Sequence, residues 1–191
     1  FFQYSRIHTM TVSEVLKKYE WDDDKFYNSK QKNLKKFDSV FKEAGIHAKI
    51  IKEYIEKIGK SDETIIVFFA DHGTGIGERF GERNYGSYTY EETIRTFFLF
   101  LGKKFKKNSM SDKLLTTLSI FPTLLDFCGI TPEGKGHKKS LVPFLSGKND
   151  EVEEKYVFSE TGALHGKYPS PEKSNVFCIK TSKFKLIYLK T

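Results

Sequence analysis

The chain has 191 residues, of which 38% are hydrophobic and 15% aromatic, enough for a packed core, which excludes a disordered chain. The longest apolar run, TIIVFFA at 64–70, is far shorter than the roughly 20 residues of a membrane helix, so no membrane span is expected. The two cysteines, Cys128 and Cys178, form neither a disulfide framework nor a CxxC metal motif, and both are predicted to be core residues.

The net charge of +7 comes from 32 basic and 25 acidic residues and raises the question of a nucleic-acid partner. All but four of the basic residues are lysines scattered along the chain, as on an ordinary solvated surface, so no nucleic-acid partner is expected. Guanidinium binds phosphate or sulfate oxygens better than ammonium, so the positions of the arginines are informative. Three lie within 77–95 and the fourth lies two residues from His8; they are Arg6, Arg79, Arg83 and Arg95.

The first half of the chain predicts a strand, two helices and a second strand. Residues 1–8 alternate and are rich in aromatic side chains, which predicts a buried strand. From about Asn28 to Gly59 apolar residues recur at helical spacing around Gly45, which predicts two consecutive amphipathic helices. The run at 64–70 is fully apolar, as is typical of a central strand in a parallel sheet.

The second half predicts another strand at 96–101, a helix from about Ser111 to Cys128 that Pro122 kinks or restarts, and then a change of character. After about residue 131 come the short strand-like runs KYVFSETG, NVFCIKT and FKLIYLKT, the last two joined by a tight turn at Ser182. The fold class is therefore α/β, with an α/β layer over 1–130 and a small antiparallel appendage over 131–191.

The segment VFFADHGTGIGERFGERNYG at 67–86 is the sharpest local feature. Asp71 and His72 follow an apolar strand at once, and ligands bind off the carboxyl ends of strands in open α/β sheets. A carboxylate beside an imidazole suits a divalent ion, with Mn, Zn or Fe fitting the mixed pair and Ca or Mg the oxygen donor. The alternative is that Asp-His-Gly only closes the strand, with Asp71 capping the next turn and Gly73 supplying left-handed backbone geometry.

These residues resemble the sulfatase branch of the alkaline phosphatase superfamily. The match lies in the succession of ETIIVFFADHGTGIGERFG, YTYEETIRTFFLF, LLTTLSIFPTLLDFCGI, GKGHKKSLVPFLSG and NVFCIKTSKFKLIY, and it covers about residues 1–8 and 62–191. The resemblance implies the C-terminal portion of an alkaline-phosphatase-like three-layer α/β/α sheet. It also implies part of a metal-dependent hydrolase that acts on an anionic substrate, a sulfate ester.

The resemblance further implies roles for single residues. Asp71 and His72 would be ligands of a divalent metal ion (Ca, Mn, Mg or Zn), which orients the nucleophile and neutralises the oxygens of the transferred group. His8 matches a catalytic histidine that binds the ester or protonates the leaving group, although a plain strand-end histidine is the alternative. Glu91 and Arg95 match positions that brace the loop.

The chain departs from the family at a position that bears on the substrate. Sulfatases usually carry a lysine nine residues before the matching arginine, and here that position is Gly86. Arg79 or Arg83 could bind the substrate in its place, or could instead form surface salt bridges with Glu78 or Glu82. Hydrolysis of phosphodiesters or phosphonates and phosphoryl transfer therefore remain open. His137 and His165 lie in loops of the appendage, where solvated histidines are the simpler interpretation.

The family's nucleophile motif, C-x-P-S-R, does not occur, because Cys128 precedes Gly129 and Cys178 precedes Ile179. The nucleophile and the first metal carboxylates lie upstream in the family, so we expect a partner in the N-terminal half of the same enzyme. We also expect the 191-residue chain by itself to be inactive. The competing interpretation is a binding module, a remnant that has lost the reaction.

Overall fold

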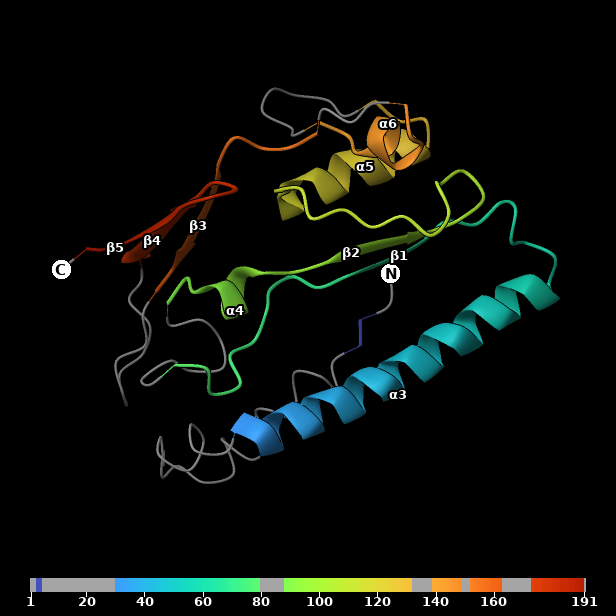
Figure 1. Ribbon diagram of the computed structural model, residues 1–191. Coiled ribbons are helices and arrows are strands. Elements are labelled where there is room, and N and C mark those ends of the chain that lie inside the picture. Colours follow the sequence, from blue (N-terminus) through green and yellow to red (C-terminus); the bar gives the residue numbers. More distant parts are fainter. Residues whose placement is uncertain are drawn as a thin grey trace. The chain divides into compact units, whose positions relative to one another are not determined.

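The computed structural model describes residues 3–4, 30–79, 88–131, 139–148, 152–162 and 173–190 (Figure 1). The chain forms two compact units. The first comprises Phe1–Thr64 and His72–Thr96, and the second comprises Ile65–Asp71 and Phe97–Thr191. The strand predicted for residues 1–8 lies outside the described residues except at 3–4.

The first unit contains α3 (Lys30–Lys57) and the short helix α4 (Glu91–Ile94). The prediction of two helices around Gly45 was wrong, because α3 is one continuous helix of 28 residues, seen end to end in Figure 1. Gly45 is exposed and a Cβ there would meet nothing within 4 Å, so the glycine has no packing role that would break the helix. The Asn33 amide donates to the Ile76 carbonyl at 3.0 Å, which ties α3 to the loop after the apolar strand.

The second unit begins with a pair of strands, β1 (Ile66–Phe69) and β2 (Phe98–Leu101). Both predicted strands are confirmed, but the neighbour of β1 in the described part of the chain runs antiparallel, with Ile66 opposite Leu101 and Phe69 opposite Phe98. An apolar run indicates burial on both faces and does not by itself fix the direction of the neighbouring strand.

Helix α5 (Ile120–Phe127) follows the 3₁₀ turn η1 (Thr117–Ser119) and packs on β2, where the Phe127 and Phe100 rings lie 6.3 Å apart. The helix predicted from Ser111 thus starts nine residues late. Pro122 falls in the first turn of α5, where its missing N–H has no partner to lose, so it begins the helix and does not kink it.

Cys128 caps the C-terminal end of α5 and is exposed, so its prediction as a core residue was wrong; Cys178 is buried as predicted. The Cys128 N–H bonds to the carbonyls of Leu124 and Leu125, which places the residue at the point where the helix ends at the surface.

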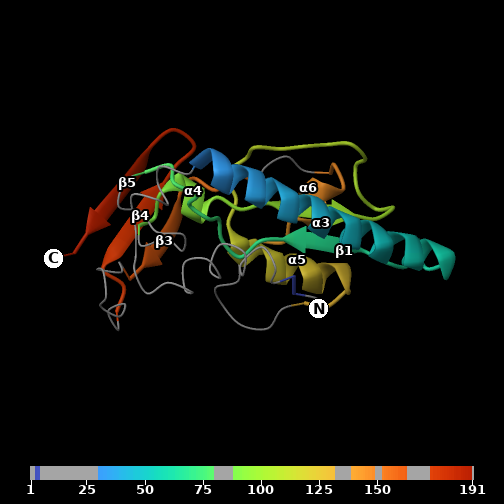
Figure 2. The same ribbon diagram turned by 90° about the horizontal axis from the view of Figure 1, so that it is seen from below.

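The predicted antiparallel strands are confirmed as β3 (Val157–Thr161), β4 (Val176–Lys180) and β5 (Lys185–Leu189), in the order β3-β4-β5. Figure 2 shows them side by side. The turn at Ser182 is closed by Thr181, whose N–H donates to the Phe184 carbonyl at 2.8 Å and whose hydroxyl accepts the Phe184 N–H. Alternation places Val176 and Cys178 on the buried face.

Hydrogen bonds join residues on both sides of the domain boundary proposed at residue 130. The Leu141 N–H, just before α6 (Val142–Leu145), donates to the Thr123 hydroxyl at 2.9 Å, and the Glu154 N–H donates to the Leu114 carbonyl at 2.9 Å. The division into 1–130 and 131–191 stays a proposal, and these bonds are the kind that would pack the smaller part on the larger. In the described part of the chain no helix is long and apolar enough to cross a bilayer.

Two buried threonines make a matched test of these contacts. The Thr123 side chain is 0% exposed, donates to the Ser119 carbonyl and accepts the Leu141 N–H. The Thr89 side chain is 2% exposed, and its hydroxyl has no hydrogen-bond partner among the described residues.

We predict that Thr123→Val lowers the free energy of unfolding by about 1–3 kcal/mol, because it leaves two buried backbone groups without their partner. Thr89→Val should leave stability unchanged or higher, because it removes a buried hydroxyl that has no hydrogen-bond partner among the described residues. Urea unfolding of both variants checks this, and equal losses in the two would contradict it.

Candidate functional site

The predicted metal ligands, Asp71 and His72, follow β1 after a single residue, Ala70, with which the apolar run ends. Asp71 and His72 are both exposed, and the chain passes from the second unit to the first between them. The His72 Nδ1 atom lies 2.6 Å from the Gly73 carbonyl oxygen. Because a carbonyl can only accept, we assign the proton to Nδ1, which leaves the lone pair on Nε2. The imidazole therefore presents a donor atom of the kind that binds a metal ion.

Gly73, the residue after His72, packs directly against α4. Its N–H donates to the Thr93 carbonyl at 2.8 Å. A Cβ at this position would lie 2.3 Å from the Glu92 carbonyl oxygen and 2.8 Å from that of Arg95. No side chain fits there, because both obstacles are backbone atoms. The Asp-His-Gly sequence therefore does close the strand, and the Gly73 backbone packs directly against the backbone of α4.

The first turn of α4 is itself held from inside the loop. The Thr93 hydroxyl donates to the carbonyls of Tyr88 and Tyr90, both at 2.9 Å, and the Arg95 N–H donates to the Glu91 carbonyl at 2.8 Å. Thr93 is buried. These bonds agree with a bracing role for the segment that contains Glu91 and Arg95.

Among the described residues, Arg79 pairs with Glu92 and not with Glu78, while Glu82 lies outside the described residues. Its Nε donates to Glu92 Oε1 at 2.7 Å, and its guanidinium carbon lies 4.6 Å from the centre of the Tyr90 ring. The Glu78 carboxylate accepts instead from the Ile76 N–H at 2.6 Å. Glu92 and Tyr90 could not be found from the sequence, because no helix or strand spacing links Arg79 to residues 11 and 13 positions further along the chain.

Several predicted residues lie outside the described part of the chain. These are His8, Arg83, Glu82 and Gly86, and the loop histidines His137 and His165. The structure therefore places Asp71, His72 and Arg79. Of these, His72 and Arg79 belong to the same unit, and their anchors meet at Glu92. Within the described residues no three His, Cys, Asp or Glu side chains gather closely enough to hold a metal ion.

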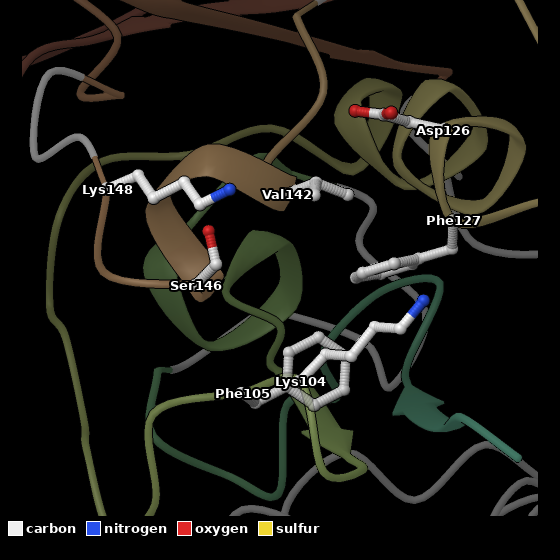
Figure 3. A pocket seen from close by; sticks show the side chains of 7 residues that line it. All are labelled: Lys104, Phe105, Asp126, Phe127, Val142, Ser146 and Lys148. Atoms are coloured by element: carbon white, nitrogen blue, oxygen red, sulfur yellow. The ribbon is translucent and has the colours of Figure 1, made fainter. Parts of the chain in front are cut away.

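A cavity of about 420 Å³ lies in the second unit (Figure 3). The Phe105 and Phe127 rings, 5.2 Å apart and edge to face, form its apolar side, and Lys104 and Lys148 lie on different sides of it. Of the predicted site residues that the structure describes, Asp71, His72 and Arg79, none lines this cavity. We therefore do not assign the reaction to it.

Comparison with protein families gives two matches. The family model described as Sulfatase matches residues 14–130. The model described as N-sulphoglucosamine sulphohydrolase, C-terminal, matches residues 81–191. The first match includes β1, Asp71, His72, α4 and α5.

Among curated proteins, the chain is similar to the N-acetylglucosamine-6-O-sulfatase of Bacteroides thetaiotaomicron, with 31% identity over 71% of the chain and 24% of that protein. It is also similar to the Delta 4,5-hexuronate-2-O-sulfatase of the same organism, with 36% identity over 51% of the chain and 21% of that protein. The chain thus spans about a quarter of the length of these relatives.

Among solved structures, the chain resembles a phosphonate monoester hydrolase from Silicibacter pomeroyi, with a TM-score of 0.65 and 23% identity over 75% of the chain and 30% of that protein. It also resembles a protein solved in complex with its substrate D-glucosamine-2-N,6-O-disulfate, with a TM-score of 0.60 and 29% identity over 73% and 28%. These likenesses confirm the fold class expected from the sequence, a C-terminal portion of the alkaline-phosphatase-like fold.

The close packing of Gly73 against the backbone of α4 can be tested directly. We predict that Gly73→Ala lowers the free energy of unfolding by about 1–3 kcal/mol, because the new methyl group must displace the backbone of α4. The matched control is Gly45→Ala, in the middle of α3 with no atom near the added Cβ, which should raise stability by about 0.5–1 kcal/mol. Denaturant unfolding measures the stability of both variants. A Gly73→Ala protein as stable as Gly45→Ala would contradict the close packing of Gly73 against α4.

Proposed function

The chain belongs to the sulfatase family, and from that membership we propose that it supplies part of the catalytic centre of a hydrolase that cleaves sulfate esters. The observation that carries the proposal is the match over residues 14–130, because it includes the strand, the Asp71-His72 pair and α4 in one continuous alignment. Two relatives are named for sulfated sugars, the 6-O-sulfate of N-acetylglucosamine and the 2-O-sulfate of a hexuronate. Sulfated sugars are therefore the substrate class that we propose.

The sulfatase family generally uses a divalent metal ion, and we propose Asp71 and His72 as two of its ligands here. A carboxylate oxygen and an imidazole nitrogen fit such an ion, and with the proton assigned to Nδ1, which faces the Gly73 carbonyl, Nε2 is the ring nitrogen with a lone pair for a metal. Ca, Mn, Mg and Zn all remain candidates. When bound, a divalent ion supplies Lewis-acid stabilisation of the negative oxygens of the ester group.

The other roles fall to side chains that bind or move charge. We propose that the Arg79 guanidinium binds the ester oxygens through its terminal nitrogens, since its bond to Glu92 uses Nε. Arg83 would be a second such cation, four residues further along the chain. His8 would bind the ester or donate a proton to the leaving oxygen, because imidazole exchanges protons near neutral pH.

A second candidate function is hydrolysis of phosphodiesters or phosphonates. The observation that favours it is Gly86, which stands where sulfatases usually carry a lysine. Without that lysine, the ester oxygens would be bound by Arg79 or Arg83, and a guanidinium fork suits phosphoryl as well as sulfuryl oxygens. The likeness to the phosphonate monoester hydrolase is at 23% identity and supports the fold alone.

In the full-length protein we predict hydrolysis of p-nitrophenyl sulfate and of glucosamine 6-sulfate, with turnover at least about 100-fold lower in Asp71→Ala and His72→Ala. At a metal concentration of about 100 Kd, binding should stabilise the wild-type protein by about 2.7 kcal/mol, and either variant should lose most of this gain. Thermal melts with and without added Ca, Mn, Mg or Zn measure it.

The matched controls are Asp112→Ala, an exposed carboxylate in another segment, and His47→Ala, a histidine of α3 that contacts the Tyr4 ring. Both should keep turnover and the metal-dependent rise in melting temperature. Faster turnover of p-nitrophenyl phosphate or phenyl phosphonate than of the sulfate would favour the second candidate. No turnover of any ester, with no metal-dependent stabilisation, would leave the binding-module interpretation.

A further inference from the structure

The guanidinium of Arg79 is held at two points on the segment that begins α4. Glu92 lies in the first turn of α4 and accepts the Arg79 Nε–H at 2.7 Å. Tyr90, the N-cap residue, presents its ring to the guanidinium at 4.6 Å. An ion pair fixes the position of the group and a ring fixes the tilt of its plane, so the two contacts together orient the guanidinium.

This pair differs from the other ion pairs of the first unit. In the described pairs Lys49–Glu53, Lys52–Glu56 and Lys60–Glu63 every side chain is 49% exposed or more, and the partners lie three or four residues apart. Such pairs contribute little, because water screens them and both side chains stay mobile. Glu92 is only 13% exposed and lies 13 residues from Arg79, which is itself 52% exposed. The carboxylate is therefore a fixed anchor, while the cation it holds reaches solvent.

Glu92 also lies beside the contact between Gly73 and α4. The Gly73 backbone rests on the carbonyls of Glu92 and Thr93, and the Glu92 side chain holds Arg79. The backbone of α4 at Thr93 thus holds the chain next to His72, and the neighbouring residue Glu92 holds the guanidinium through its carboxylate. A change at Glu92 that spares the backbone would release Arg79 and leave the His72 segment in place.

We propose that Glu92 is a positioning residue, which together with the Tyr90 ring holds the Arg79 guanidinium ready to bind the oxyanion of the substrate ester. The proposal rests on the proposed function of Arg79. Glu92 takes Nε, so the two terminal nitrogens remain as a parallel pair of donors for two oxygens of a sulfate group. Holding the fork in advance lowers the entropy that binding would otherwise cost, although the carboxylate also reduces the net attraction for an anion.

The test is a double-mutant cycle in the full-length protein, with KM and kcat for p-nitrophenyl sulfate and the dissociation constant of inorganic sulfate by calorimetry. Glu92→Ala should raise KM and weaken sulfate binding about tenfold, with a smaller change in kcat. Glu92→Gln keeps an acceptor for Nε–H and should recover part of this loss. In an Arg79→Ala background, Glu92→Ala should change neither quantity. Glu63→Ala, which removes the carboxylate of an exposed pair, is the control and should behave as wild type.

The outcomes separate this proposal from the one on which it rests. A wild-type protein that hydrolyses no sulfate ester contradicts the proposed function, yet the calorimetric cycle still tests the Glu92–Arg79 coupling. The positioning role is overturned if Glu92→Ala has the same effect with and without Arg79. It is also overturned if Glu92→Ala lowers the melting temperature while sulfate affinity and KM stay at their wild-type values.

Discussion

The absence of a side chain at Gly73 is the constraint on which the described site depends. With 2.3 Å between a built Cβ and the Glu92 carbonyl oxygen, any other residue would push the loop away from α4. The close approach lets the Gly73 N–H reach the Thr93 carbonyl and sets the carbonyl of Gly73 where the His72 imidazole can donate to it. A single small residue thereby fixes the backbone beside His72 and the tautomer of its ring. The same helix holds Arg79 through Glu92, so the cation and the imidazole share one support.

The chemistry proposed for the chain needs more than this support. A divalent ion takes four or more ligands, and Asp71 and His72 would supply two. The proposed metal site therefore needs further ligands from outside the described residues. It also requires a nucleophile, since no C-x-P-S-R motif occurs in the sequence. Both requirements agree with a chain that spans about a quarter of the length of the sulfatases it matches. Within that share, the described residues contribute the pair proposed to bind the metal, Asp71 and His72, and one oriented guanidinium.

Sequence reasoning reached the elements whose signal is local. Alternation located β3, β4 and β5, and the Asp-His-Gly succession after an apolar run located the candidate site. It failed where the outcome depends on surroundings. Gly45 does not interrupt α3, because the helix on either side supports it at an exposed position. The helix predicted from Ser111 begins only at Ile120, after the 3₁₀ turn η1. The Arg79–Glu92 pair could not be predicted from the sequence, since no spacing rule links two residues that lie 13 positions apart. Arg79 was considered for the substrate only because the family's lysine is missing at Gly86, and the sequence did not indicate what holds its guanidinium.

The most direct measurement of the central claim is anomalous diffraction from crystals of the full-length protein grown with Mn²⁺ or Zn²⁺. The account predicts one strong peak bonded to a carboxylate oxygen of Asp71 and to Nε2 of His72, at about 2.0–2.3 Å from each, with Nδ1 still turned to the Gly73 carbonyl. A peak bonded to neither residue, or to Nδ1 of His72 with the Gly73 contact broken, would contradict it.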